Sequence, residues 1–268
     1  MLDEVARDGL VLLGCGKMGT ALLTGWLAAG VPAASVWVIE PNPTDWLKSL
    51  GLHLNEGVPP QPSVAVLAVK PQMMGAALPA LQVLGNGKTL FISIAAGTSI
   101  ATFEAALGAK TPIVRTMPNT PAMVGRGITG ICANQPGRRG LPLAKALMLA
   151  VGEVVELDGE HQIDAVTAVS GSGPAYVFHL IEALAAAGVA EGLDPEIAMK
   201  LARATVCGAG ELAYRSPELS AQLRINVTSP GGTTAAALAH LMNPETGLAP
   251  LLARAVHAAA ERGRELGK

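Results

Sequence analysis

The stretch "VLLGCGKMGTALLTG" (residues 11–25) decides the fold class of this 268-residue chain. An apolar, strand-like segment leads through Gly14, Gly16 and Gly19 into a pattern with apolar residues at helical spacing. In a G-x-G-x-x-G turn the first glycine permits the tight turn and the second lets the backbone approach a pyrophosphate. The third lets the helix pack on the strand, and the helix-start amides hold the anion. The pattern therefore predicts a dinucleotide site, the alternative being a glycine-rich turn that binds nothing.

The residues that follow alternate between strand-like and helical patterns. Short Val/Ile/Leu-rich runs bounded by Gly or Pro occupy 9–14, 35–40, 63–70, 89–97 and 112–117, and the segments 127–133 and 152–157 extend the series. Near-continuous apolar strands suit a parallel sheet that is covered on both faces. Strands alternating with helices predict an α/β fold, a doubly wound (Rossmann) parallel sheet.

From about residue 158 the strand signal disappears. Alanine-rich helical patterns follow, at 163–169, 173–192, 194–214 and 247–266. This shift predicts two domains, a dinucleotide-binding Rossmann domain over 1–157 and an all-α domain over 158–268. A helical module rich in small residues has two plausible uses, to form a wall of a cleft and to dimerise.

Composition narrows the function classes. The chain is 50% hydrophobic and 15% charged, with a net charge of −2, so it offers no polycationic surface and we expect no nucleic-acid partner. The three cysteines form no C-x-x-C pair and no histidines pair at ligand spacing, so we expect no metal and a reducing compartment. The acidic start and the lack of an uninterrupted apolar run of membrane-spanning length predict a soluble cytoplasmic protein without a membrane partner.

Glu40 bears on the choice of nicotinamide cofactor. It ends the second predicted strand, 21 residues beyond Gly19, where a carboxylate usually binds the ribose 2′-hydroxyl of NAD and repels the 2′-phosphate of NADP. The segment "EPNPTDW" (40–46) carries no Lys or Arg, but Asn42 and Thr44 could hydrogen-bond that phosphate. A solvated loop carboxylate is the alternative, and the sequence leaves NADPH and NADH both open.

Two more segments end strands on the expected ligand side of the sheet. "AVKPQ" (68–72) brings a cation and a rigid turn to that edge, and "SIAAG" (93–97) lacks bulky side chains, which allows a flat ring to approach. A surface lysine and simple packing are the respective alternatives.

Three unusual segments remain, "RTMPNTPA" (115–122), "SGSGPAY" (170–176) and "NVTSPGGTTAAAL" (226–238). None contains a recognisable triad or acid/base motif, so the chemistry is expected to lean on the cofactor. Gly171 and Gly173 are interpreted as a kink or a close helix crossing, with Pro174 restarting the helix.

In this order the glycine turn, "AVKPQ", "RTMPNTP", "SGSGPAY" and "VTSPGGTT" resemble the pyrroline-5-carboxylate reductase family over nearly the whole chain. The resemblance implies an oxidoreductase that makes L-proline from 1-pyrroline-5-carboxylate with NAD(P)H. It also implies a C-terminal domain that interlocks with its twin in a homodimer, and an active site between the domains that draws on the partner chain.

The resemblance also assigns residues. It implies cofactor contacts at Gly14, Cys15, Gly16, Lys17, Met18, Gly19, Asn55, Val69, Lys70, Pro71, Ala95, Ala96 and Gly97, with Asn226 beside the nicotinamide. For the substrate it implies Glu160, Val227, Ser229, Gly232, Thr233 and Thr234. Glu40 and Pro41 depart from NADPH-preferring members, which carry small or basic residues there.

The segment "SPGGTT" (229–234) suits a small carboxylate. Gly231 and Gly232 keep side chains away from the start of a helix, where unblocked amides including that of Thr233 form a carboxylate cradle. The Thr234 hydroxyl can then hydrogen-bond the ring nitrogen, which makes Thr234 the candidate catalytic residue. A redundantly capped glycine loop is the alternative.

Two other functions stay open. A nicotinamide-nucleotide-binding redox sensor explains the glycine turn but leaves "MPNTP" and "SPGGTT" without a purpose. A related imine or hydroxy-acid dehydrogenase usually needs a lysine or an acid/base side chain at the hydride site, and no convincing one can be placed in this chain.

Overall fold

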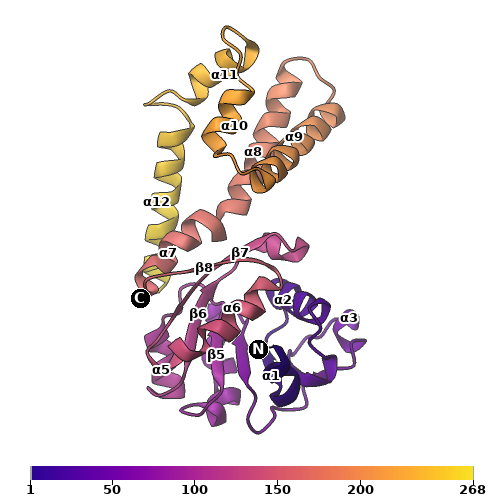
Figure 1. The fold of residues 1–268 in the computed structure, drawn as a ribbon, viewed down its shortest axis with the longest axis vertical. Helices are drawn as coiled ribbons and strands as arrows, with labels where there is room; N and C mark the ends of the chain where they lie inside the picture. Colours follow the sequence, from indigo (N-terminus) through magenta and orange to yellow (C-terminus); the bar gives the residue numbers. More distant parts are fainter. Residues whose placement is uncertain (1, 268) are drawn as a thin grey trace. The chain divides into compact units, whose positions relative to one another are not determined.

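A computed structural model describes residues 2–267 of the chain (Figure 1). By its internal contacts the chain forms two compact units. Unit 1 takes the described residues up to Gly171 and those from Ala259 onward, and unit 2 is Ser172–Ala258. This division differs from the predicted boundary at 157/158, because the residues just after it pack on the sheet. Ile163, for example, is fully buried in a core cluster of unit 1.

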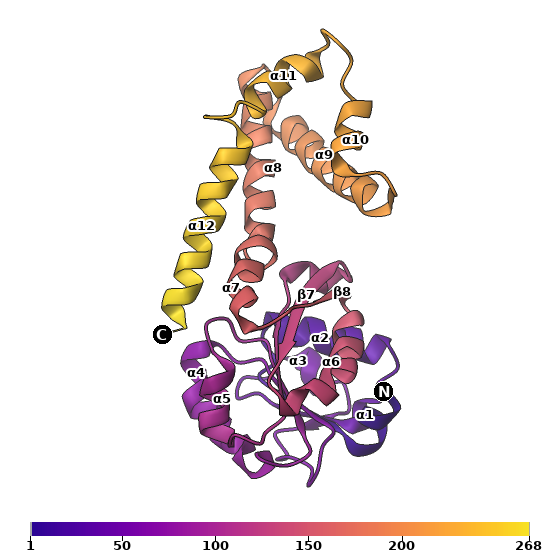
Figure 2. The same cartoon turned by 60° about the vertical axis from the view of Figure 1, so that its left-hand side comes forward.

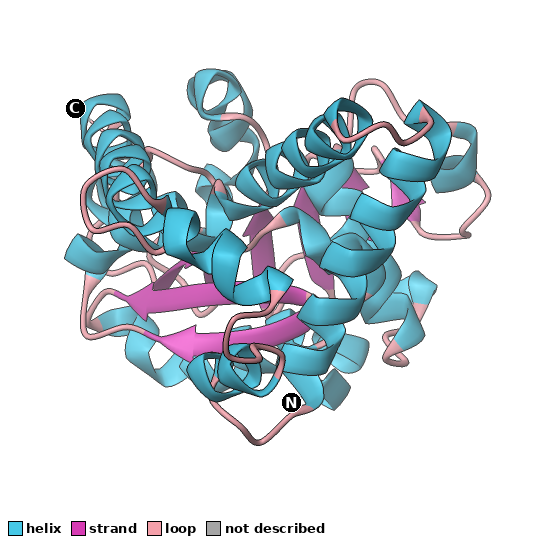
Figure 3. Cartoon of the chain, turned by 90° about the horizontal axis from the view of Figure 1, so that it is seen from above, coloured by secondary structure: helices cyan, strands magenta, loops and turns pink. Residues whose placement is uncertain are grey.

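The eight strands of the described residues belong to one sheet in unit 1. Figure 3 draws strands in magenta, with helices lying over them in this view. The strands are β1 (Leu10–Leu13), β2 (Val36–Ile39), β3 (His53–Leu54), β4 (Val64–Leu67), β5 (Leu90–Ser93), β6 (Ile113–Met117), β7 (Gly127–Ala133) and β8 (Gly152–Glu156). Their order is β3-β2-β1-β4-β5-β6-β7-β8. The doubly wound α/β architecture that the alternating pattern predicts is confirmed.

One pair in this sheet departs from the predicted parallel arrangement. β7 runs antiparallel to β6, whereas every other neighbouring pair is parallel. The link between β6 and β7, residues 118–126, holds only the 3₁₀ turn η3 (Thr120–Val124). A parallel crossover needs a dozen or more residues, so this short link turns the chain back on itself.

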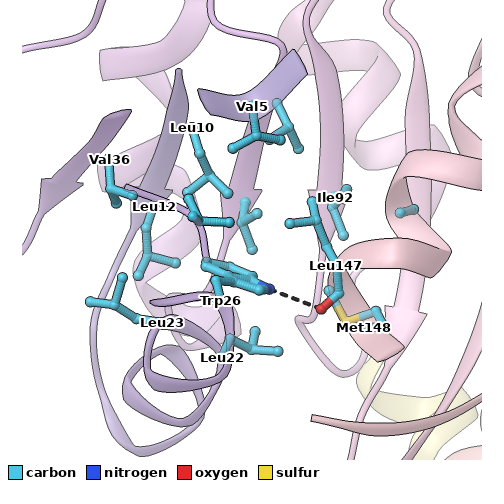
Figure 4. Close-up of a cluster of buried hydrophobic side chains, with 14 of the residues drawn as sticks. Val5, Leu10, Leu12, Leu22, Leu23, Trp26, Val36, Ile92, Leu147 and Met148 are labelled. Carbon is cyan, nitrogen blue, oxygen red and sulfur yellow. Dashed lines mark hydrogen bonds between the residues drawn. The ribbon is translucent and has the colours of Figure 1, made fainter. Parts of the chain in front are cut away.

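One face of the sheet is covered by α1 (Leu2–Asp8), α2 (Lys17–Ala28) and α6 (Leu141–Leu149). Leu10 and Leu12 of β1 point into this layer and are fully buried there. Trp26 fills its centre, and its indole Nε1 donates to the Leu147 carbonyl at 2.9 Å (Figure 4). The bond satisfies the only polar atom of a fully buried ring.

The opposite face is covered by α4 (Pro71–Ala77), the 3₁₀ helix η2 (Leu78–Leu84), α5 (Ile100–Leu107) and α7 (Ile163–Val166). Val11 and Leu13 point to this side, so β1 is buried on both faces. Short elements complete unit 1: η1 (Ala33–Ser35), α3 (Asp45–Lys48), η4 (Pro136–Gly140), η5 (Glu160–Gln162) and a π-helical turn (Thr167–Gly171). The π turn falls at the predicted irregularity of "SGSGPAY", and Pro174 lies in the first turn of the next helix, as expected.

Unit 2 contains α8 (Gly173–Ala190), α9 (Pro195–Arg215), α10 (Ser220–Asn226) and α11 (Thr233–Leu241), and α12 (Leu248–Leu266) divides its residues between the two units. α8 and α9 pack against each other (Figure 2) through Ala185, Ala198 and Ala202. Asp194 caps α9 by accepting from the Glu196 amide at 2.9 Å.

Unit 2 buries little of its own apolar surface. Its core cluster consists of three alanines, while Phe178, Leu212 and Val227 are 60%, 56% and 65% exposed. Among the described residues, the helical stretch Glu160–Ala190 is long and apolar enough to cross a membrane by length and composition, a test that a core helix also passes. Ionisable residues including Asp164 and Glu182 interrupt that stretch.

Candidate active site

The segments predicted to hold a cofactor meet at one edge of the sheet. β1, β4 and β5 are neighbours and parallel, so their carboxyl ends lie side by side. The glycine turn follows β1, residues 68–71 follow β4, and residues 94–97 follow β5. In open α/β sheets ligands bind outside these carboxyl ends.

The three glycines of the turn differ in how much space surrounds the position of a Cβ atom. Gly14 has φ +89°, and a Cβ there would lie 2.7 Å from Val69 Cγ1. A Cβ at Gly19 would lie 2.6 Å from the Gly14 carbonyl oxygen, so the fold itself excludes side chains at both positions. A Cβ at Gly16 would meet nothing within 4 Å. The space over Gly16 is open, as the approach of a pyrophosphate requires.

Two helices begin at this edge without a side-chain cap. Gly16 is the N-cap of α2 and Lys70 that of α4, and neither makes a side-chain capping bond. Pro71 opens α4, where a missing N–H costs nothing. Exposed helix-start amides over an open glycine fit the phosphates of a dinucleotide.

The Glu40 carboxylate is held beside the glycine turn. The Cys15 amide donates to Glu40 Oε2 at 2.8 Å, and the Asn42 amide donates to Oε1 at 3.0 Å. The Asn55 side chain fixes the Glu40 backbone, since its Oδ1 accepts from the Glu40 N–H and its Nδ2 donates to the Glu40 carbonyl, both at 2.9 Å. Glu40, Asn42, Asn55 and Cys15 therefore lie together.

The loop after β5 is compact and small. Ala95 is buried, and its amide donates to the buried Ser93 Oγ at 3.2 Å. Gly97 has φ +70°, and a Cβ there would lie 3.1 Å from Leu266 Cβ. The loop therefore presents Ala96 and backbone, without a bulky side chain, at the carboxyl end of β5.

Glu160 is held by partners in unit 1. Its Oε1 accepts from the Arg115 Nη1 at 2.6 Å and from the Ile100 amide, the first residue of α5, at 2.8 Å. The Arg115 side chain is only 7% exposed. Burial, with the Glu160 charge as a second cause, raises the pKa of the neighbouring Cys132 thiol to about 11.

Two residues of this region were not assigned from the sequence. Arg115 is a charged residue inside an otherwise apolar strand, which is a usable signal of a buried ion pair. Asn119 of "MPNTP" is buried, accepts from the Ile128 amide at 2.9 Å and donates to the Ser170 carbonyl at 3.1 Å. Part of this motif therefore braces unit 1 internally.

In unit 2 the residues 227–232 form a turn that joins α10 to α11. Gly231 has φ +71°, and the Gly232 amide donates to the Ser229 carbonyl at 3.0 Å. Gly232 is the N-cap of α11 and provides no side-chain bond. The first intrahelical bond here is that of Ala236 to the Gly232 carbonyl, which leaves the amides of Thr233 and Thr234 directed out of the helix.

Asn226 lies at the end of α10 with its amide group oriented by two neighbours. Its Nδ2 donates to Glu218 Oε2 at 3.0 Å, and its Oδ1 accepts from Gln222 Nε2 at 2.8 Å. Glu218 was not singled out from the sequence. Among the candidate substrate residues, Glu160 belongs to unit 1 and Val227, Ser229 and Gly231–Thr234 belong to unit 2.

Among the described residues no cluster of His, Cys, Asp and Glu is arranged to hold a metal ion. The three cysteines are all free thiols; Cys15 and Cys132 are buried and Cys207 is exposed. Burial raises the pKa of the Cys15 thiol, which lowers the fraction present as thiolate.

Comparison with known proteins supplies independent information. A model of the pyrroline-5-carboxylate reductase dimerisation domain matches residues 160–266, close to the predicted second domain, and a model of NADP oxidoreductase, coenzyme F420-dependent, matches residues 10–97. A pyrroline-5-carboxylate reductase of Pseudomonas aeruginosa is 41% identical over 97% of both chains.

Solved structures agree. That of a pyrroline-5-carboxylate reductase from Coxiella burnetii has a TM-score of 0.91 and 36% identity, covering 97% of this chain and 99% of the other. A Plasmodium falciparum pyrroline carboxylate reductase with NADP bound has a TM-score of 0.83 and 30% identity, covering 98% and 99%.

Proposed function

Because this chain belongs to the pyrroline-5-carboxylate reductase family, we propose that it reduces 1-pyrroline-5-carboxylate to L-proline with NAD(P)H, the last step of proline biosynthesis. The nicotinamide cofactor supplies the hydride when bound. The product keeps the carboxylate of the substrate, and the ring C=N becomes a C–N single bond with the uptake of one proton. The chain itself must bind both molecules, orient them and exclude water.

The observation that best supports dinucleotide binding is the geometry of the turn at Gly14–Gly19. Its outer glycines are required by the fold, whereas Gly16 faces open space at an uncapped helix start. We assign the diphosphate to the amides of Gly16–Gly19. Val69, Lys70 and Pro71 line the next strand end, and the loop Ala95–Gly97 offers the flat surface for the nicotinamide. The position of Asn55, bonded to Glu40, supports its place in the same site.

The uncapped start of α11 supports the substrate part. We assign the substrate carboxylate to the amides that follow Gly231 and Gly232, and hydrogen bonding of the ring nitrogen to the Thr234 hydroxyl. Val227 and Ser229 belong to the same turn. Asn226 remains the candidate beside the nicotinamide, with its amide oriented by Glu218. Positioning dominates this chemistry, because a protonated imine accepts hydride without a strong acid.

Glu160 was expected to contact substrate. Its Oε1 is engaged with Arg115 and Ile100, and no bond of its Oε2 appears among the described contacts. We propose that Oε2 remains for the substrate, while the ion pair with Arg115 sets its direction.

The exposed apolar side chains of unit 2 and the match to a dimerisation domain support a homo-oligomer, and we propose a homodimer as the minimal form. Three free cysteines support a cytoplasmic location. No observation favours a redox sensor or a related imine or hydroxy-acid dehydrogenase over the reductase activity for which the relatives are named.

The test is a steady-state assay with 1-pyrroline-5-carboxylate and each of NADH and NADPH. We expect cofactor oxidation that depends on the cyclic imine. Thr234→Ala should lower kcat by about 10²-fold or more and leave dinucleotide binding unchanged. Thr246→Ala, which removes a threonine hydroxyl from another loop of unit 2, is the matched control and should keep full turnover. Normal turnover of Thr234→Ala would remove Thr234 from the mechanism.

A further inference from the structure

The Glu40 carboxylate has a fixed place at the dinucleotide edge of the sheet. Both of its oxygens are engaged, Oε2 by the Cys15 amide at 2.8 Å and Oε1 by the Asn42 amide at 3.0 Å. Cys15 stands between the first two glycines of the turn. A full negative charge is therefore held against the glycine turn itself, and rotation of the side chain away from it would break both bonds.

The backbone that carries this carboxylate is fixed as well. Asn55 bonds both the N–H and the C=O of Glu40 at 2.9 Å, as a neighbouring strand would. Asn55 adopts φ +57°, a left-handed conformation that asparagine tolerates better than most residues. This brace extends the pairing of β2 and β3 by one residue, to the point where the ribose of a dinucleotide is expected.

No cation balances Glu40 in its own loop. Within the described segment 40–48 the single basic residue is Lys48, and its Nζ pairs with Asp45 Oδ1 at 3.0 Å. Lys17 of the glycine turn opens α2, to whose first amides we assign the diphosphate common to both cofactors. It therefore contributes to binding either cofactor and does not by itself distinguish them.

We propose that Glu40 makes this chain selective for NADH over NADPH, which goes beyond the proposed function and rests on it. Each carboxylate oxygen has a second lone pair, so Glu40 can accept from the ribose 2′-hydroxyl while keeping its amide bonds. A 2′-phosphate in the same place brings like charge against a carboxylate that cannot move away. This preference differs from the cofactor named for the relatives: the matching family model and the Plasmodium structure both name NADP.

Direct binding to the full-length protein tests the proposal. Titrations of NADH and NADPH, followed by reduced-nicotinamide fluorescence and by calorimetry, should give a Kd for NADH at least about tenfold lower. The fragments 5′-AMP and adenosine 2′,5′-bisphosphate isolate the ribose, and 5′-AMP should bind more tightly. NADPH binding as tightly as NADH overturns the proposal.

Variants then identify the residue responsible. Glu40→Gln keeps an oxygen acceptor but removes the charge, and should tighten NADPH binding about tenfold while weakening NADH binding several-fold. Glu56→Gln is the matched control, since it removes one exposed carboxylate near the end of the neighbouring strand, and the ratio of the two Kd values should not change. Lys17→Gln should weaken both cofactors by the same factor.

The outcomes separate this inference from the proposed function. A folded Glu40→Gln protein with an unchanged ratio of Kd values overturns the role of Glu40. If that variant does not fold, the wild-type ratio and the fragment pair still decide whether NADH is preferred. Failure of the wild type to bind either dinucleotide contradicts the proposed function instead.

Discussion

At the scale of single residues, the glycines of the turn after β1 are required for different reasons. Gly14 and Gly19 have no room for a side chain, because Val69 and the Gly14 carbonyl occupy the positions next to their Cβ sites. Gly16 has an ordinary φ of −69° and open space around it. The fold therefore explains glycine at two positions, and at the third the proposed approach of a diphosphate explains it.

This difference predicts opposite effects for two alanine substitutions. Gly14→Ala must adopt φ +89° and meet Val69, so we expect a loss of about 2–4 kcal/mol of stability. Gly16→Ala should cost less than about 1 kcal/mol, yet weaken NADH binding about tenfold or more, because its methyl group enters the path of the diphosphate. Thermal unfolding and fluorescence titration of both variants measure these effects. Equal destabilisation by the two substitutions would contradict the assignment.

Sequence reasoning reached some of these residues and not others. Glu40 follows from its place after the second strand, but its bonds to the Cys15 and Asn42 amides depend on side-chain rotation, which no spacing reveals. The Arg115–Glu160 pair joins residues 45 positions apart, so it needed the tertiary structure. Glu218 became visible only through its contact with Asn226.

At the scale of elements, most strands were predictable because each forms a run of Val, Ile and Leu residues that is bounded by Gly or Pro. Strand β3 has two residues and was missed; it is held by its pairing with β2 and by the stacking of His53 on Trp37 at 4.3 Å between ring centroids. The helices α1 and α4 were also not predicted, because they are short and their apolar residues show only weak helical periodicity. The antiparallel β7 depends on the length of one connection, which a count of residues 118–126 could have revealed.

The start of α11 is the element on which substrate binding is proposed to depend. Gly231→Ala would place a side chain at φ +71° and destabilise this turn by about 1 kcal/mol. We expect the KM for 1-pyrroline-5-carboxylate to rise about tenfold while the Kd for NADH stays constant. Gly231→Asn should be milder, because asparagine tolerates the left-handed region. Asparagine as harmful as alanine would show that side-chain bulk, and not backbone conformation, is limiting.

At the scale of the whole molecule, the two units differ in how they are stabilised. Unit 1 buries large side chains on both faces of its sheet, whereas the core cluster of unit 2 consists of alanines. An alanine cluster contributes little apolar burial, so unit 2 needs a further contact to cover side chains such as Phe178 and Leu212. The family's dimerisation domain matches this same part of the chain.

A second copy of the chain is therefore expected to stabilise unit 2, and a charge on its apolar surface should prevent this. Phe178 is 60% exposed in the single chain and Val83 of unit 1 is 79% exposed. Phe178→Glu should produce monomers in sedimentation velocity and lower the unfolding temperature, because a buried unpaired carboxylate costs several kcal/mol. Val83→Glu introduces the same charge at a more exposed apolar position of unit 1 and should leave the oligomer intact. If Phe178→Glu remained fully oligomeric, the interface would have to lie on another face of unit 2.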